Sequence, residues 1–221
     1  MIRRENLVPD VASVHGLRIL FVMATEQEYG ANLKKQIRPL ITGVGPVEAA
    51  AATAATLADL SHAGHAPDLV FSLGSAGSRK LEHAAIYQIS GVAYRDMDAS
   101  PIGFEKGITP FLDEPAEIPI PHRIANVPVA SISTGGAIVS GAAYAAIATD
   151  MVDMESFAIL RAARRFDIPM IGLRGISDGR NDLTGLDDWT EYLHIIDEKL
   201  ADTVDDFAGH VANGSFNLQP M

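Results

Sequence analysis

Three acidic side chains in this sequence stand at junctions between predicted secondary-structure elements. Glu155 lies near the start of a predicted helix, and Asp178 follows a short apolar run that suits a buried strand. Glu28 belongs to the acidic segment ATEQE, which follows another apolar run. Because ligands of open α/β sheets bind at the carboxyl ends of the strands, these acids are candidates for a shared site.

Each acid also has an explanation that involves no ligand. Acids in the first turn of a helix interact favourably with the helix dipole, which would account for Glu28 and Glu155. Aspartate before glycine often forms the turn at a strand end, which would account for Asp178. Arg174 favours a site, because a charged side chain within an apolar strand needs a buried anionic partner. Glu155 or Asp178 could supply that partner, and a charged cluster at a sheet end is a candidate functional site.

The elements that would position these acids follow from apolar periodicity and from the Gly and Pro residues between apolar runs. Short apolar runs predict strands at residues 17–23, 37–42, 69–73, 86–92, 127–133 and 170–176. Helical patterns predict one helix that begins at Glu26 and three more at residues 47–63, 151–165 and 187–211. A short helix or loop is predicted at residues 144–149. This alternation predicts one α/β domain with a mostly parallel sheet. We expect the domain to span residues 17–211, between an irregular N-terminal extension (1–16) and a C-terminal tail (212–221).

The composition is that of a soluble, globular chain of 221 residues, 48% of them hydrophobic. The formal net charge of −11 and the lack of a long basic cluster argue against nucleic acid and anionic membranes as partners. The chain has no cysteine, which excludes disulfides, thiolate catalysis and zinc–thiolate sites and fits the cytoplasm. Asp96 and Asp98 have no third ligand at metal-binding spacing, so we expect no metal.

Glycine-rich segments follow two of the predicted strands. Gly43, Gly45 and Pro46 predict a tight turn where the backbone passes close to a ligand, but the full dinucleotide fingerprint and a phosphate-loop lysine are absent. Residues 74–78, GSAGS, could form a floor under a ligand or a plain turn from strand to helix.

A long loop is predicted over residues 94–111, and it carries the apolar residues Ile102, Phe104 and Phe111. Loops of this length are usually functional, and exposed apolar groups often mark a subunit contact. We therefore expect a homodimer.

The order of short motifs along the chain resembles the purine nucleoside phosphorylase and nucleosidase superfamily, above all its methylthioadenosine/S-adenosylhomocysteine nucleosidase branch. The motifs are ATEQE (24–28), TGVG (42–45), LGSAG (73–77), DMDASPIGFEKGITP (96–110), TGGAIV (134–139), VDMES (152–156) and LRGISD (173–178). The resemblance implies a single three-layer α/β/α domain around a twisted, mostly parallel mixed sheet, usually dimeric.

The resemblance also implies a separate role for each acid. Asp178, oriented by Ser177, would be the general acid that protonates N7 of adenine. Glu28 would position and deprotonate the attacking water near Ser75, and Glu155 would hold the ribose hydroxyls. Adenine leaves poorly as an anion, so an acid must protonate it, and carboxylates stabilise the oxocarbenium charge on ribose. Water needs a base on the opposite face of the sugar, as in inverting glycoside hydrolysis.

The remaining implied positions bind the substrate. They are Ser75, Ala76, Gly77, Ile138, Val139, Met154, Arg174 and Ser177, with Ile102 and Phe104 closing the alkylthio pocket of the neighbouring subunit. Arg174 would fix Glu155. The backbone at Met154 would hold the ribose, and the backbone around Val139 would read the adenine edge.

Ser72 distinguishes water from phosphate as the second substrate. A phosphate clamp needs arginine, and the phosphorylase branch carries one where this sequence has Ser72. We expect hydrolysis of 5′-methylthioadenosine and/or S-adenosylhomocysteine, releasing adenine without a cofactor. The alternatives are a phosphorylase, a nucleosidase for another 5′-substituted adenosine, and a nucleoside-binding protein without activity. Three departures from the family pattern affect the substrate: Ile138 replaces a stacking aromatic, the segment between Glu28 and Thr42 is short, and Ser78 replaces a customary glycine.

Overall fold

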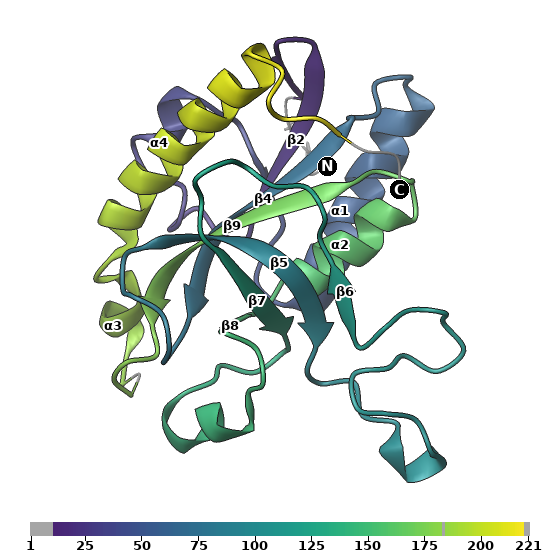
Figure 1. The fold of residues 1–221 in the computed structure, drawn as a ribbon, viewed down its shortest axis with the longest axis vertical. Coiled ribbons are helices and arrows are strands. Elements are labelled where there is room, and N and C mark those ends of the chain that lie inside the picture. The colour runs from purple at the N-terminus through teal and green to yellow at the C-terminus, as the bar shows by residue number, and fades with distance from the viewer. Residues whose placement is uncertain (1–10, 183, 219–221) are drawn as a thin grey trace, which may run out of the picture.

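The computed structural model describes residues 11–182 and 184–218. In these ranges the chain forms a nine-stranded sheet with helices on both faces (Figure 1). The five longest strands are β2 (Leu17–Met23), β4 (Leu69–Gly77), β5 (Ile86–Tyr94), β7 (Val129–Thr134) and β9 (Met170–Asp178). β2 and β9 pair in parallel with β4, β7 pairs in parallel with β5, and β5 joins the two groups by pairing antiparallel with β9. The predicted α/β domain with a mostly parallel mixed sheet is confirmed.

Within the described residues the sheet also has four short strands, and only the one within residues 37–42 was predicted as a strand. They are β1 (Ala12–Val14), β3 (Leu40–Ile41), β6 (Glu117–Pro119) and β8 (Met151–Asp153). β1 pairs antiparallel with β2 through a two-residue turn in which His15 and Gly16 both have positive φ, as such hairpin turns require. The prediction of an irregular extension is therefore wrong for β1, and residues 1–10 lie outside the described residues. β3 is shorter than the strand predicted at 37–42.

The helix predicted over residues 151–165 begins later than expected. Met151–Asp153 forms β8, which pairs in parallel with β7, and the helix begins only at Ser156. All three residues of β8 are buried, so the apolar residues that suggested a helix serve a strand instead. Glu155 is the N-cap of the helix, with φ −132°. The chain thus turns from strand to helix at a candidate catalytic acid.

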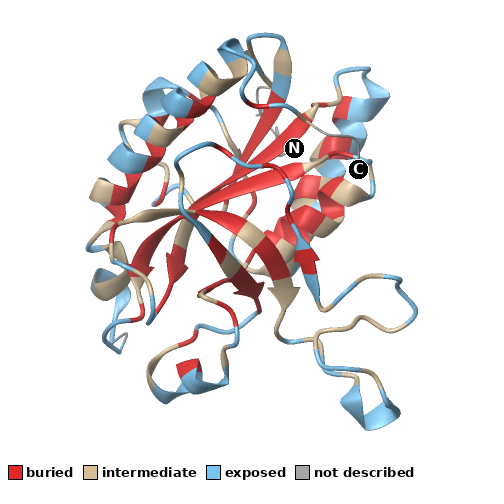
Figure 2. Ribbon diagram, viewed as in Figure 1, coloured by how far each residue is buried: buried red, intermediate tan, exposed pale blue. Residues whose placement is uncertain are grey.

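The helices cover both faces of the sheet. The α-helices are α1 (Pro46–His62), α2 (Ser156–Arg164), α3 (Leu186–Thr190) and α4 (Leu193–Ala212), and the 3-10 helices are η1 (Leu33–Lys35), η2 (Ser100–Ile102) and η3 (Gly141–Ala146). Leu20 and Val22 of β2 pack into the core beneath α1 and α2. Ile19 and Phe21 point the other way, into the core beneath α4, because side chains alternate along a strand. Burial is concentrated on the sheet and the inner sides of the helices (Figure 2).

Two helix predictions differ from the structure. No helix opens at Glu26, because residues 26–28 form a turn and the next helical segment is η1. The predicted last helix is divided, since Glu191 and Tyr192 lie between α3 and α4. No helix in the described ranges is long and apolar enough to cross a membrane.

One strand contact brings the candidate site together. Gly77 at the end of β4 pairs antiparallel with Val152 of β8. β4 also pairs along its length with β9. The end of β8, and with it Glu155, is therefore held next to the carboxyl ends of β4 and β9, where Ser75 and Asp178 lie.

Candidate active site

Glu28 lies on the turn after β2, with its carboxylate in the protein interior. Oε1 accepts hydrogen bonds from the backbone N and from Oγ of Ser75, both at 2.7 Å. Oε2 is buried and has no hydrogen-bond partner among the described residues. Nε1 of Trp189 donates to Ser75 Oγ at 3.0 Å. Burial raises the pKa of Glu28, while the hydrogen bonds from Ser75 oppose that rise. One oxygen of Glu28 is thus fixed, and the other is suited to accept a proton from water.

Glu155 reaches from the junction of β8 and α2 to the turn before α1. Its Oε1 accepts a hydrogen bond from the backbone N of Gly45 at 2.8 Å. Gly45 has φ 100°, a conformation that favours glycine. Burial, followed by the negative charge of Asp153, raises the pKa of Glu155 to about 7. The glycine turn expected to pass close to a ligand therefore holds one of the candidate acids.

Asp178 ends β9 at a β-bulge. Ala76 pairs with Ile176 and Gly77 pairs with Asp178, so Ser177 is the extra residue. Bulges re-aim side chains and are frequent beside active sites. Oγ of Ser177 donates to Oδ2 of Asp178 at 2.7 Å. Burial raises the pKa of Asp178, although the hydroxyl of Ser177 lowers it.

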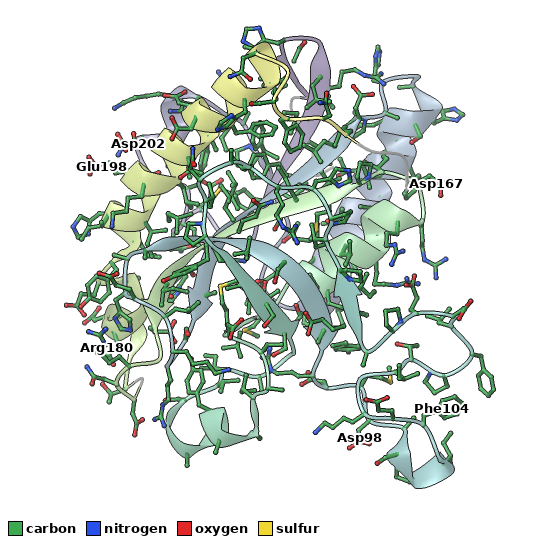
Figure 3. The ribbon with its side chains drawn as sticks, viewed as in Figure 1. Asp98, Phe104, Asp167, Arg180, Glu198 and Asp202 are labelled. Atoms are coloured by element: carbon green, nitrogen blue, oxygen red, sulfur yellow. The ribbon has the colours of Figure 1, made fainter. Side chains whose placement is uncertain are left out.

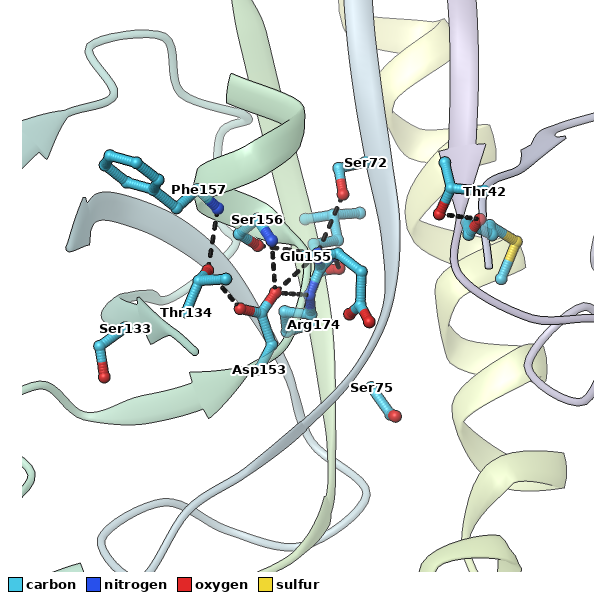
Figure 4. Close-up of polar contacts among 12 residues, drawn as sticks. Thr42, Ser72, Ser75, Ser133, Thr134, Asp153, Glu155, Ser156, Phe157 and Arg174 are labelled. Atoms are coloured by element: carbon cyan, nitrogen blue, oxygen red, sulfur yellow. Dashed lines mark hydrogen bonds and ion pairs between the residues drawn. The ribbon is translucent and has the colours of Figure 1, made fainter. Parts of the chain in front are cut away.

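Arg174 pairs with Asp153, not with Glu155 or Asp178, which corrects the partner expected from the sequence. Nη2 lies 3.1 Å and Nε 3.3 Å from Oδ2 of Asp153. The side chains of Arg174 and Asp153 are only 3% and 2% exposed. Figure 4 shows this ion pair in the interior, with Glu155 beside it. A buried guanidinium is stable only with such a partner.

Asp153 is the residue of this cluster that the sequence analysis missed. Besides Arg174, its carboxylate accepts hydrogen bonds from Oγ1 of Thr134 at 2.6 Å and from the backbone N of Ser156 at 2.9 Å. The segment VDM contained a signal, because an acid within a buried apolar strand needs a partner as much as Arg174 does. The assignment of these residues to a helix concealed it.

The structure gathers some of the predicted substrate-binding positions and separates others. Ser75, Ala76 and Gly77 lie on β4, and Ser177 lies on β9. Met154 directly follows β8, and Val139 packs against Val152 of that strand. Ile138, by contrast, is 72% exposed. Ile102 is exposed and Phe104 half-buried on the loop that projects away from the sheet (Figure 3). Within one chain, Ile102 and Phe104 do not join the acids.

Glu28 and Glu155 line one small cavity together with Arg174, Ser72 and Ser75. Two carboxylates and one guanidinium therefore share this space, and the guanidinium is already paired with Asp153. Within residues 11–182 and 184–218, no group of three or more His, Asp or Glu side chains is placed to hold a metal ion.

The chain matches the model of the phosphorylase superfamily over residues 30–212. A 5′-methylthioadenosine/S-adenosylhomocysteine nucleosidase from Haemophilus influenzae (strain PittEE) is 31% identical over 164 residues, 66% of this chain and 69% of the relative. A solved nucleosidase of the same description, from Colwellia psychrerythraea 34H in complex with adenine, is 25% identical with TM-score 0.70 over 86% of this chain and 94% of its own. A futalosine hydrolase mutant of Helicobacter pylori strain 26695 shares the fold, with 16% identity and TM-score 0.73 over 87% of this chain and 98% of its own. The chain therefore belongs to the phosphorylase superfamily, and its sequence relatives there are nucleosidases, which are N-glycosyl hydrolases.

Proposed function

We propose that this protein hydrolyses the N-glycosidic bond of 5′-methylthioadenosine and/or S-adenosylhomocysteine and releases adenine. The observation that carries the proposal is the arrangement of three largely buried carboxylates with different partners. Glu28, Glu155 and Asp178 are held by a serine, a backbone amide and a second serine, respectively. Glycoside hydrolysis needs an acid for the leaving group and a base for water, and the third carboxylate can stabilise the cationic sugar.

Asp178 would supply the proton to adenine. The leaving base must be protonated as the glycosidic bond breaks, because an adenine anion leaves poorly. Burial raises the pKa of Asp178, so a larger fraction of this carboxyl holds its proton near neutral pH. The hydroxyl of Ser177 binds Oδ2, and Oδ1 is then the oxygen that would face N7.

Glu155 would hold the ribose hydroxyls. The sugar gains positive charge in an oxocarbenium-like transition state, and a nearby carboxylate stabilises that charge in a buried site. With a pKa of about 7, Glu155 ionises readily when the sugar becomes cationic. Its hydrogen bond from the backbone of Gly45 keeps it in position.

Glu28 would act as the base for water. Its Oε1 is anchored by Ser75, and its buried Oε2 has no partner in the described part of the chain. A carboxylate whose pKa is raised by burial is a stronger base than an exposed one. Water bound to Oε2 would be oriented by one fixed carboxylate.

Water, not phosphate, suits this cavity. The guanidinium of Arg174, which lines the cavity, is neutralised by Asp153. The hydroxyl oxygen of Ser72 already accepts a hydrogen bond from Arg174 at 2.9 Å. The carboxylates of Glu28 and Glu155 would repel a phosphate dianion bound in the same cavity. A phosphate clamp would need unpaired arginines.

The 5′ group of the substrate is proposed from the named nucleosidase relatives. The alternative is another 5′-substituted adenosine. A solved structure of the same fold is a futalosine hydrolase, so the fold by itself does not fix the nucleoside. Ile138 is exposed and is not aromatic, so it does not stack on the base as an aromatic side chain would, and this bears on affinity and base preference rather than on the 5′ group.

We further propose that two copies associate and share their pockets. Phe111 is 92% exposed and Ile102 is 70% exposed on the projecting loop. The ring of Phe104 packs edge-on against Phe111, with centroids 5.6 Å apart. A second subunit that covered these groups would bury apolar surface, and it would receive Ile102 and Phe104 as a wall of its 5′ pocket.

The reaction is tested by measuring the release of free adenine from a panel of adenosines with different 5′ groups. Each substrate is assayed in the presence and in the absence of phosphate. We expect adenine and a free 5′-substituted ribose, at a rate independent of phosphate. Asp178→Asn is the matched control, because it keeps the shape of the acid but has no proton to give. A 5′-substituted ribose 1-phosphate as the product would show that the protein is a phosphorylase. Binding of these nucleosides without release of a base would show that the protein lacks the activity.

A further inference from the structure

Tyr144 is a buried tyrosine beside the candidate acid Asp178, and the mechanism above does not use it. It lies on η3, is 9% exposed, and its phenol oxygen has no hydrogen-bond partner among the described residues. Buried phenols usually find a partner. A buried hydroxyl without a partner, next to the candidate acid Asp178, therefore indicates that Tyr144 has a functional role.

The ring of Tyr144 is held on two sides. It packs with Val139 and Val152 in a small apolar cluster. The guanidinium carbon of Arg79 lies 5.3 Å from the ring centroid, within cation–π range. Both contacts act on the ring and leave the hydroxyl free to serve another group.

Gly77 shows where that hydroxyl points. A Cβ atom on Gly77 would collide with the phenol oxygen of Tyr144 and would lie 2.7 Å from Oδ1 of Asp178. Gly77 and Asp178 are direct partners across β4 and β9 because of the bulge at Ser177. The phenol and Oδ1 thus converge over the same glycine, on the opposite side of the carboxyl group from the oxygen that Ser177 binds.

We propose that Tyr144 is a positioning residue for the general acid Asp178. The phenol of Tyr144 donates a hydrogen bond to Oδ1 of Asp178 as the carboxylate forms on proton transfer to the base. This proposal rests on the proposed nucleosidase function. In the step, the O–H bond of the Asp178 carboxyl breaks and an N–H bond forms on the leaving base. The negative charge that remains on Asp178 is shared between the hydroxyls of Ser177 and Tyr144, and the phenol keeps its own proton.

The electrostatics of the pair support this direction of donation. Burial, followed by the negative charge of Asp178, raises the pKa of Tyr144, so the phenol remains a donor at every working pH. Arg79 and Arg95 act in the opposite sense on Tyr144. Besides Tyr144, His83 also faces Asp178, and burial lowers the pKa of its imidazole.

Tyr144→Phe removes the hydroxyl and keeps the ring, so its packing is preserved. Hydrogen bonds from hydroxyls lower the pKa of a carboxyl group, and their loss raises it. We expect kcat for adenine release to fall about tenfold, the value of one hydrogen bond to a charged group, with KM little changed. We also expect the alkaline limb of the pH profile to move to higher pH, because the general acid then keeps its proton longer. His83→Gln as a background removes the titration of the imidazole from this profile.

The matched control is Tyr87→Phe. The hydroxyl of Tyr87 accepts a hydrogen bond from the backbone of Glu82 at an exposed position, so its loss should leave kcat and the pH profile unchanged. In an Asp178→Asn background, Tyr144→Phe should have no further effect on kcat, because the two residues act through one carboxyl group.

A carbon-13 NMR titration of the Asp178 carboxyl group, in the free protein, tests the contact without any assay of activity. The pKa of Asp178 should rise in Tyr144→Phe. An unchanged pKa would overturn the proposal even if the enzyme releases adenine, and a raised pKa would support it even if the substrate is another nucleoside. A rise in KM alone, or full additivity with Asp178→Asn, would show that Tyr144 acts on the substrate or the fold instead.

Discussion

Arg174 and Asp153 form an ion pair between the consecutive strands β9 and β8, with Nη2 and Oδ2 3.1 Å apart and both side chains almost fully buried. The pair lies beside Glu28 and Glu155, because Arg174 lines the same small cavity as these two acids. Because Arg174 is paired with Asp153, its guanidinium does not form an ion pair with Glu28 or Glu155.

Loss of the charge of Asp153 should destabilise the fold. In Asp153→Asn the guanidinium of Arg174 stays buried without a counter-ion, which costs about 3 kcal/mol of unfolding free energy or more. Urea denaturation measures this change. Asp68→Asn is the control, since Asp68 pairs with Arg18 at the surface and exposed pairs contribute about 1 kcal/mol or less. Equal losses in the two variants would mean that the buried pair has no special role.

Glu28→Gln should abolish most of the turnover. The amide can still accept the hydrogen bonds of Ser75, but it cannot take a proton from water, and kcat should fall by at least about 100-fold. Steady-state adenine release at saturating substrate measures this. Glu26→Gln is the matched control, because Glu26 lies on the same turn and is exposed. If Glu28→Gln keeps kcat within a few-fold of the wild type, the base is another group.

Stability should decline as the pH rises through the titration of Glu155. Its folded pKa of about 7 lies above the ordinary value of 4.5, so the folded state binds this proton more tightly than the unfolded state does. The stabilisation is complete below pH 4.5 and is lost as the pH rises through 7. The shift corresponds to about 3 kcal/mol.

Urea denaturation of the wild type and of Glu155→Gln at a series of pH values measures this contribution. Glutamine cannot ionise, so the variant should show a shallower decline. Part of the slope should remain, because the pKa values of Glu28 and Asp178 are also raised. Identical slopes in the two proteins would contradict the assignment of the titration to Glu155.

Arg95 holds the segment that would read the adenine edge. Its guanidinium donates to the carbonyl oxygens of Ser133, Gly135 and Ala137 around the end of β7, and to that of Asp153. Lysine cannot reproduce this planar, forked set of donors. In Arg95→Lys the segment before Val139 should lose its fixed position.

We therefore expect Arg95→Lys to raise KM about tenfold, which corresponds to about 1.4 kcal/mol of binding free energy, with a smaller change in kcat. Steady-state kinetics with one 5′-substituted adenosine measures both. Arg123→Lys is the control, since Arg123 also donates to backbone carbonyls, of His122 and Ser90, away from this segment. A KM equal to that of the wild type would remove Arg95 from the account of the base pocket.

Phe111→Asp should separate the proposed dimer. A charge at the most exposed aromatic of the loop would oppose its burial against a second subunit. Sedimentation velocity should show a shift from dimer to monomer, with KM raised because Ile102 and Phe104 no longer reach the neighbouring pocket. The exposed Asp113→Asn, two residues away, is the control. If the wild type is a fully active monomer at nanomolar concentration, the proposal that two subunits share their pockets is refuted.

Several elements of the fold could be predicted from the sequence because their information is local. β2 has the expected bounds and is apolar apart from Arg18, and α1 begins at Pro46, where proline suits a first helical turn. β9 needed only the apolar run after Pro169, with Arg174 as its one interruption. The acids Glu28, Glu155 and Asp178 were identified for a related reason: Glu28 and Asp178 follow predicted strands, and Glu155 lies near the start of a predicted helix.

The sequence by itself thus determined the α/β class, most strands, and the residue types that could do chemistry. Only the tertiary structure decided which of them meet. β8 has three residues and depends on pairing with β7 and with Gly77, and local periodicity does not distinguish so short a strand from the start of a helix. For that reason Asp153 emerged as the partner of Arg174 only in the folded chain. Tyr144 stands in an alanine-rich segment without a local signal, and its approach to Asp178 exists because a β-bulge and a glycine make room for it.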